Sequence, residues 1–387
     1  MPRTVKPWNK QAKAPSFSAL VQPVHTILPH MPPLEARGNR PLHMEFEQQL
    51  KALILYHLEE YTSGTELLQV LEEGGFAREE IAPPNGIKKS SFFEAVNSRG
   101  LEQLTYLFQE LYPLAAATVP AEYSALGKLV GIDGSLITAT LSMHWADYRG
   151  GARKARVHLG FDLNRSLPRK LFLTHGKADE RPFVSHLLAP GDTGVMDRLY
   201  QCHKAFDRLQ NEGKHFVCRI KANTQKTCIK STAVKPDSIV FYDALVLLGT
   251  PGINQTKKEV RLIGYRVNGI AYWVATDRFD LCAEEIALIY KLRWDIEKFF
   301  AWWKRHLKVY HLIARSHYGL MVQILAGLIT YLLLAIYCHN QYKEKVSIKR
   351  VRELRIRIEN EARLLEEDPS APQDFKDQNN FYAHAKT

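Results

Sequence analysis

Residues 290–304 have the sequence YKLRWDIEKFFAWWK, in which the polar residues Tyr290, Arg293, Glu297 and Lys304 are widely spaced. A helix turns by about 100° per residue, so these four residues fall on one face of a helix. The residues between them are mostly large and apolar, which suits the rest of the helix surface for burial. The polar face is either an ordinary solvent-exposed stripe or one wall of a cleft, and the surrounding bulk favours the cleft.

The spacing of this polar face, Y-x2-R-x3-E-x6-K, resembles the signature of the DDE transposases of bacterial insertion sequences, a family with hairpin-forming members. The resemblance implies an α/β fold, with a ribonuclease H-like catalytic domain that carries a β-rich insertion. It also implies two aspartates upstream of the glutamate, each at the end of a strand, and an all-α N-terminal DNA-binding region. The resemblance is firm over residues 129–307 and looser in the N-terminal third.

Composition agrees with a nucleic-acid partner. The 387 residues are enough for two or three domains, and the net charge of +11 indicates an acidic partner, with nucleic acid preferred over an anionic membrane surface. The five cysteines are scattered without a C-x2-C pair, which argues against a disulfide framework and against structural zinc. The N-terminus lacks the apolar core of a secretory signal, so we expect a cytoplasmic protein. Residues 319–338 have the length of a membrane span but are better explained as a buried core helix, so no membrane association is expected.

The chain divides into four expected parts. Residues 1–43 are expected to form a basic flexible arm, residues 44–112 a helical DNA-binding domain, residues 127–340 the catalytic domain, and residues 341–387 a charged helix and tail. Residues 113–126 are expected to be a linker, and strand-like segments between about 222 and 280 are expected to be the β-rich insertion.

The N-terminal helical region has a candidate DNA-contacting site at Lys88, Lys89 and Ser91. Residues 87–100 predict a helix with Ser90 or Ser91 as its N-cap. In a helix-turn-helix module, such a helix start meets phosphates and base edges. A plain helical bundle that packs on the main domain is an equally good interpretation.

Two aspartates match the expected upstream acids. Asp133 follows the apolar run of residues 129–132, and the strand is expected to end at Asp133-Gly134-Ser135, with another strand after it. The alternative is a turn aspartate, because Asp-Gly is a common turn pair. Asp197 ends the next predicted strand and precedes a helix, where it could simply be an N-cap. Asp192 precedes that strand and is not the candidate.

Glu297 is the third acid, whereas Asp295 points to another side of the helix and is assigned a structural salt bridge. Three converging carboxylates suit Mg²⁺, which prefers oxygen ligands. Two such ions (Mn²⁺ may substitute) activate a water or a DNA 3′-OH and stabilise the leaving oxygen. Asp133, Asp197 and Glu297 are therefore the expected catalytic and metal-binding residues.

The other residues of the polar face are expected to contact DNA. Arg293 and Lys304 can contact phosphates near the scissile bond. By resemblance to hairpin-forming relatives, Tyr290, Arg293 and Lys304 hold the 5′ phosphate of the uncut strand, although Tyr290 could instead pack in the core. Trp273 in the insertion could stack on a flipped base, but a core role is favoured. Basic runs at residues 149–156 and 343–357 are either a DNA track or a solvated face, and the solvated face is favoured for the second run.

The sequence therefore predicts a DNA transposase that cuts at insertion-sequence ends and transfers 3′-OH strands to target DNA by two-metal phosphoryl transfer. Its expected partners are double-stranded DNA, both the terminal inverted repeats and the target, and a second copy of the chain in the DNA complex. The alternatives are a non-transposing ribonuclease H-like nuclease and a catalytically inactive DNA-binding protein.

Overall fold

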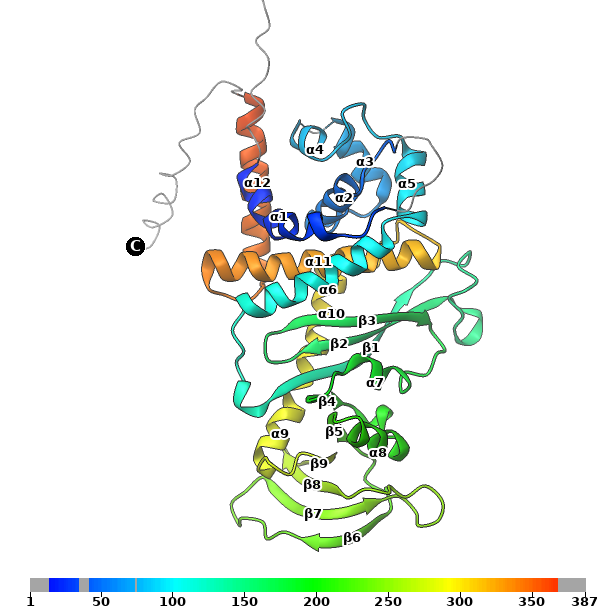
Figure 1. Ribbon diagram of the computed structural model, residues 1–387, viewed down its shortest axis with the longest axis vertical. Coiled ribbons are helices and arrows are strands. Elements are labelled where there is room, and N and C mark those ends of the chain that lie inside the picture. Colours follow the sequence, from blue (N-terminus) through cyan, green and yellow to red (C-terminus); the bar gives the residue numbers. More distant parts are fainter. Residues whose placement is uncertain (1–13, 35–41, 74, 368–387) are drawn as a thin grey trace, which may run out of the picture.

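The computed structural model describes residues 14–34, 42–73 and 75–367. One mixed sheet lies on one side of a long central helix, and a set of N-terminal helices lies on the other (Figure 1). The expected basic arm and charged tail fall partly outside the described residues. Within the described part, residues 15–27 form a helix, α1 (Pro15–Ile27), where a flexible arm was expected. The reason is that Phe17, Leu20 and Val24 share one buried face of it.

The sheet has nine strands among the described residues, in the order β3-β2-β1-β4-β5-β9-β8-β7-β6. The pairs β1–β4 and β4–β5 are parallel and the other neighbours are antiparallel. Residues 222–280 supply the last four strands, which extend the same sheet because β9 pairs with β5. The bounds are β1 Lys128–Thr138, β2 Lys154–Asp162, β3 Leu167–His175, β4 Asp192–Met196, β5 His215–Arg219, β6 Lys226–Ser231, β7 Val240–Leu248, β8 Val260–Val267 and β9 Ile270–Thr276.

Strand β1 is longer than the sequence indicated. It does not end at Asp133 but continues to Thr138, and the second strand expected after Asp133 is part of it. The cause is the antiparallel partner β2, whose pairing with β1 extends to Thr138 and Lys154. What ends near Asp133 is the pairing of β1 with β4, which stops at Gly131 and Val195. Asp133 thus lies where β1 loses one of its two neighbours.

The stretch expected as one helix forms two, α9 (Ala283–Leu292) and α10 (Trp294–His306), which meet at Arg293. Arg293 keeps helical backbone angles, but its N–H donates to the carbonyl of Tyr290 (3.2 Å), and its own carbonyl accepts from Ile296 N (3.3 Å). Hydrogen bonds over three residues tighten the turn locally. Helix α10 packs against β1, and Phe299 lies 4.8 Å from Phe161 of β2 between ring centroids.

The central helix α11 (His317–Tyr342) is buried along nearly its whole length. It is the one described helix that is long and apolar enough to cross a membrane, and its apolar window lies almost entirely inside the fold. Strand β3 packs on one side of it and the N-terminal helices on the other (Figure 1). This burial agrees with the interpretation of residues 319–338 as a core helix.

The N-terminal helices share one hydrophobic core with α11 and with α12 (Ile348–Glu367). At the junction, the Tyr56 hydroxyl donates to the carbonyl of His311 (2.7 Å). Helix α6 runs through Pro113 to Thr118, so the expected linker begins later than predicted, because the buried Leu111 and Ala115 keep the helix packed beyond the proline. The bounds are α2 Phe46–Leu58, α3 Gly64–Glu73, α4 Gly75–Glu80, α5 Lys89–Ser98 and α6 Leu101–Thr118.

Two shorter helices, α7 (Phe183–Leu187) and α8 (His203–Asn211), cover the sheet on the side away from α10. All five cysteines lie in the described residues and are free thiols, as expected from their scattered positions.

Candidate active site

The two candidate aspartates lie at the same edge of the sheet. Gly131 of β1 is paired with Val195 of β4, and continuing this parallel register by two residues sets Asp133 beside Asp197. Asp197 directly follows β4, as predicted. Its side chain caps the 3₁₀ turn η4 (Arg198–Tyr200) by accepting a hydrogen bond from Leu199 N at 2.7 Å, so the N-cap interpretation also describes its local role.

Asp133 is a half-buried carboxylate. Its Oδ1 accepts a hydrogen bond from Gly134 N at 2.8 Å. Its pKa is raised to about 6, chiefly by burial and also by the negative charges of Asp197 and Glu297, against the lowering effects of Gly134 N and Arg293. Asp197 and Glu297 thus both act electrostatically on Asp133.

Glu297 lies in the first turns of α10, and only one of its two carboxylate oxygens has a hydrogen-bond partner among the described residues. Oε1 accepts from the Arg293 guanidinium at 2.9 Å, while Oε2 is buried with no hydrogen-bond partner among the described residues. Arg293 itself is buried, and burial lowers its pKa while Tyr290 and Glu297 raise it, with a net increase. By contrast, Asp295 forms the expected surface salt bridge, with Lys298 at 2.9 Å.

The other two residues of the polar face flank this pair. Lys304 donates to the carbonyl of Leu136 on β1 at 2.9 Å; burial lowers its pKa and nearby Asp133 opposes that shift. Tyr290 is only 4% exposed and lies between Arg293 and Tyr272, as the core-packing interpretation describes. Burial raises the pKa of Tyr290. The polar face therefore runs from the core at Tyr290 to β1 at Lys304.

The predicted N-terminal DNA contacts lie elsewhere. Lys88, Lys89 and Ser91 are at the start of α5, which packs on α2 and α11, and no described contact joins them to the three acids. The cap of this helix is Lys88, not Ser90 or Ser91, because helical backbone angles begin at Lys89. Lys88 and Lys89 are exposed and Ser91 is half-buried.

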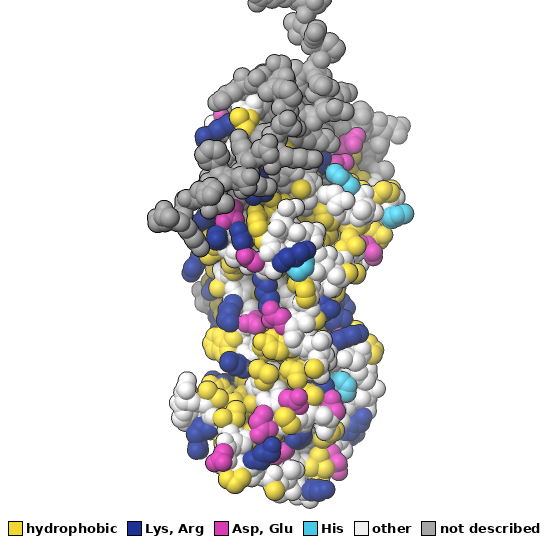
Figure 2. All heavy atoms as spheres, turned by 90° about the vertical axis from the view of Figure 1, so that its left-hand side faces the viewer, with side chains coloured by type: hydrophobic (Ala, Val, Ile, Leu, Met, Phe, Trp, Pro, Cys, Tyr) yellow, Lys and Arg dark blue, Asp and Glu magenta, His cyan; other side chains and the backbone are white. Residues whose placement is uncertain are grey.

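The second basic run is largely neutralised by ion pairs. Lys345 pairs with Glu122 (2.8 Å), Arg350 with Glu344 (2.7 Å) and Arg355 with Glu59 (3.1 Å). On the face shown in Figure 2, basic and acidic side chains are interspersed with apolar ones over the lower, sheet-bearing part. These ion pairs agree with a solvated face for residues 343–357.

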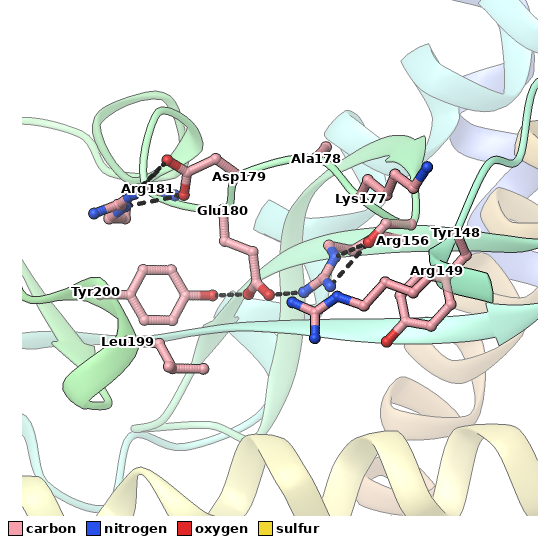
Figure 3. Close-up of a pocket in the computed structure, with 11 residues that line it drawn as sticks. Tyr148, Arg149, Arg156, Lys177, Ala178, Asp179, Glu180, Arg181, Leu199 and Tyr200 are labelled. Atoms are coloured by element: carbon pink, nitrogen blue, oxygen red, sulfur yellow. Dashed lines mark hydrogen bonds and ion pairs between the residues drawn. The ribbon is translucent and has the colours of Figure 1, made fainter.

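A cleft of about 410 Å³ beside the acids contains residues that the sequence did not single out as functional (Figure 3). Glu180 accepts a hydrogen bond from the Tyr200 hydroxyl at 2.5 Å and forms an ion pair with Arg156. Arg156 was noted only as part of a basic run. Glu180 and Tyr200 carry no sequence signal, because their contact joins separate segments of the chain.

The donor set fits a divalent cation chemically. The three acids offer the carboxylate oxygens that Mg²⁺ prefers, and Glu297 Oε2 is buried and unpartnered within the described part of the chain. As the side chains stand, no three His, Cys, Asp or Glu residues among those described lie close enough together to hold a metal ion. Closing this set around an ion therefore requires side-chain movement.

The chain is similar in sequence to several transposases. The chain is 29% identical over 220 residues to a probable transposase for insertion sequence element IS5377 of Geobacillus stearothermophilus, covering 56% of this chain and 58% of the relative. It is 28% identical over 239 residues to a putative transposase y4zB of Sinorhizobium fredii, covering 59% and 67%. A putative transposase for insertion sequence element IS4SA of Synechocystis is 25% identical over 218 residues, covering 54% and 59%.

The alignments with the first and third relatives thus span less than two thirds of those proteins. The model of the family described as the transposase DDE domain matches residues 126–333, which include all three acids and the whole polar face. Because this match covers more than half of the sequence, the chain belongs to the family of transposases that carry a DDE domain.

Proposed function

We propose that this protein is a DNA transposase that cuts at the ends of an insertion sequence and transfers the 3′-OH strands to target DNA. The observation that supports the proposal is the β1–β4 register, which sets Asp133 beside Asp197, together with the electrostatic influence of Glu297 on Asp133, within the region that matches the DDE family. The three residues come from β1, from the end of β4 and from α10, so the site depends on the tertiary fold.

The strand arrangement supports a ribonuclease H-like catalytic domain over residues 127–340. Three antiparallel strands are followed in the sheet by the parallel strands β4 and β5, and a helix, α10, packs on β1. Strands β6–β9 then represent the proposed insertion, which lengthens the sheet at its far edge.

Asp133, Asp197 and Glu297 would together hold two Mg²⁺ ions, or Mn²⁺ in their place. When bound, such ions supply the activated water or 3′-OH and stabilise the leaving oxygen in phosphoryl transfer. Among the protein's own groups, Arg293 orients Glu297 and presents its guanidinium to a DNA phosphate. Lys304 lies near Asp133 and would offer a second positive charge to the same DNA strand.

DNA recognition is assigned to two regions. Tyr290, Arg293 and Lys304 would contact the strand being cut and its neighbour, with the buried Tyr290 acting mainly by fixing the position of Arg293. Lys88, Lys89 and Ser91 in the helical region of residues 44–112 would contact the terminal repeat, because the start of α5 exposes two cations next to the N-terminal backbone N–H groups of a helix that has no side-chain cap among the described residues. Two copies of the chain would act together, one at each end of the element.

The test is strand cleavage of a labelled duplex that carries the terminal repeat, taken from the DNA that flanks the gene, in Mg²⁺. Glu297→Ala is expected to abolish cleavage, since it removes an acid that no neighbour replaces. Asp295→Ala is the matched control: it removes a carboxylate two residues away on the same helix that pairs only with surface Lys298, and is expected to cleave at the wild-type rate.

Equal loss of activity in both variants would contradict the assignment of Glu297. Cleavage by the wild type without transfer to a target duplex would indicate a non-transposing nuclease. Stable binding of the repeat by the wild type without any cleavage would indicate an inactive DNA-binding protein.

A further inference from the structure

Arg156, Glu180 and Tyr200 form a bridge of side chains along one wall of the cleft (Figure 3). They come from β2, from the segment between β3 and α7, and from the turn η4, respectively. One oxygen of Glu180 accepts from the Tyr200 hydroxyl (2.5 Å) and the other pairs with Arg156, which also donates to the carbonyl of Gly176 (3.0 Å). All three side chains are largely shielded from solvent, with Arg156 17% and Glu180 16% exposed and Tyr200 buried.

One end of the bridge lies against β1 next to Asp133. A Cβ atom added to Gly134 would come within 2.4 Å of Glu180 Oε2, so the Glu180 carboxylate rests directly on the backbone of Gly134. Successive side chains of a strand point to opposite faces. Glu180 therefore supports β1 from the face opposite to the Asp133 side chain, and only a glycine at position 134 allows this approach.

The other end of the bridge lies in the turn that Asp197 caps. Tyr200 closes this turn by donating its backbone N–H to the carbonyl of Asp197 at 3.2 Å, while Asp197 Oδ1 binds Leu199 N. The hydroxyl of Tyr200 then connects the turn to Glu180.

The bridge spans a place where the sheet provides no link. Hydrogen-bonded pairing between β1 and β4 stops at Gly131 and Val195, two residues before Asp133 and Asp197. Beyond that point, β1 is held by β2 alone among the described strands. Both Glu180 oxygens are engaged in the bridge, so this carboxylate connects β2, β1 and the turn η4.

We propose that the Arg156–Glu180–Tyr200 bridge sets the relative position of Asp133 and Asp197, and thereby the affinity of the site for divalent cations. The inference rests on the proposed function, in which these two aspartates share the ions. The three bridge residues are positioning residues, because none of them touches the reacting atoms. Removing a group that orients metal ligands typically lowers metal affinity by about 10–100-fold.

The experiment uses the full chain with the terminal-repeat duplex and Tyr200→Phe, which removes only the hydroxyl. Mn²⁺ binding to the complex is measured from the electron paramagnetic resonance signal of free Mn²⁺, after subtraction of the ions bound by the duplex alone. The cleavage rate is then measured as a function of Mn²⁺ concentration. We expect about 10–100-fold weaker Mn²⁺ binding, with the cleavage rate restored towards wild type at saturating Mn²⁺.

Tyr148→Phe is the matched control, because Tyr148 lines the same cleft but lies outside the bridge. It is expected to bind Mn²⁺ like the wild type. Glu180→Gln, which keeps the shape of the side chain but loses the charge, provides a second variant should Tyr200→Phe fold poorly; it is expected to weaken Mn²⁺ binding in the same way. Unchanged Mn²⁺ binding in a bridge variant that melts like the wild type would overturn the proposal, as would an equal loss in Tyr148→Phe.

Asp133→Asn distinguishes a failure of the bridge proposal from a failure of the proposed metal site. Weaker Mn²⁺ binding in Asp133→Asn with unchanged binding in Tyr200→Phe would refute the bridge and leave the proposed metal site standing. A wild-type level of Mn²⁺ binding in Asp133→Asn would overturn the metal site of the proposed function and, with it, the role of the bridge.

Discussion

Gln323 is a buried polar side chain on α11, and Glu297 is a partly buried one on α10. The two side chains differ in how many of their polar atoms have hydrogen-bond partners. In α11, Gln323 Oε1 accepts from Ile313 N (3.0 Å) and Nε2 donates to the carbonyl of His311 (2.8 Å). In α10, Glu297 Oε2 has no partner within the described chain. Buried polar atoms are normally paired, so the unpaired oxygen of Glu297 carries a desolvation cost that Gln323 does not.

Asp133 also differs from Gln323, because the folded protein without bound metal disfavours the ionised form of its carboxyl group. The pKa of Asp133 is about 6 in the folded state, above its ordinary value of 3.8. Between these two pH values the folded chain therefore keeps a proton that the unfolded chain has lost. Its contribution to stability is present at low pH and is lost as the pH rises through about 6. At neutral pH the charged Asp133 therefore costs stability, whereas Gln323 contributes it.

The largest effect is expected for Asp133→Asn. Cleavage of the terminal-repeat duplex should fall by at least about 100-fold, since a predicted metal-binding oxygen is replaced by an amide. The urea midpoint at neutral pH should equal or exceed that of the wild type, because the variant no longer buries a charge. A clear loss of stability together with the loss of cleavage would contradict the idea that Asp133, unlike Gln323, costs the fold stability at neutral pH.

A pH effect of intermediate size is expected from His57 at the same junction as Gln323. Its ring nitrogens face the carbonyls of Leu307 and Gln323 (2.6 and 3.1 Å), and burial lowers its pKa to about 4 from an ordinary 6.5. As the pH falls through about 6.5 the unfolded chain binds a proton that the folded chain refuses until about pH 4. Stability should therefore decrease across this window, by about 3 kcal/mol in all.

Urea unfolding of the wild type and of His57→Gln at neutral pH and at about pH 4.5 measures this effect. The slope with pH should be steeper in the wild type than in the variant. An equal slope in both would contradict the lowered pKa of His57, and a shallower slope in the wild type would mean that the buried ring is protonated in the folded state and donates to both carbonyls.

A smaller effect, on stability alone, is expected for Gln323→Leu. The substitution leaves Ile313 N and the carbonyl of His311 without their side-chain partners, which costs about 1–3 kcal/mol. The folded variant should still cleave the terminal-repeat duplex at the wild-type rate, because Gln323 lies outside the site. A cleavage defect in the folded variant would show that the α11 junction and the site are coupled.

The sequence predicted those features that depend on local patterns. The one-sided spacing of Tyr290, Arg293 and Glu297 fits their mutual contacts, and the position of Asp197 directly after a strand was correct. The apolar run of residues 319–338 was correctly interpreted as a core helix. These features follow from periodicity and from strand or helix boundaries.

Features that depend on non-local partners were missed. Strand β1 continues past Asp133 because β2 pairs with it, and residues 15–27 form a helix because α6, α11 and α12 cover its apolar face. The contact of Glu180 with Tyr200 and with the backbone of Gly134 joins segments that have no common pattern. Such features become visible only when the chain is folded.

The central position of α11 has a consequence for how this protein can be altered by recombination. Because α11 is covered by the sheet on one side and by the helices of residues 46–118 on the other, neither half has a complete core without it. A graft that exchanged the N-terminal helices for those of a relative would have to supply a matching surface for α11. Under the proposed function, changes of DNA specificity should therefore arise by substitution at exposed positions, and not by the exchange of whole modules.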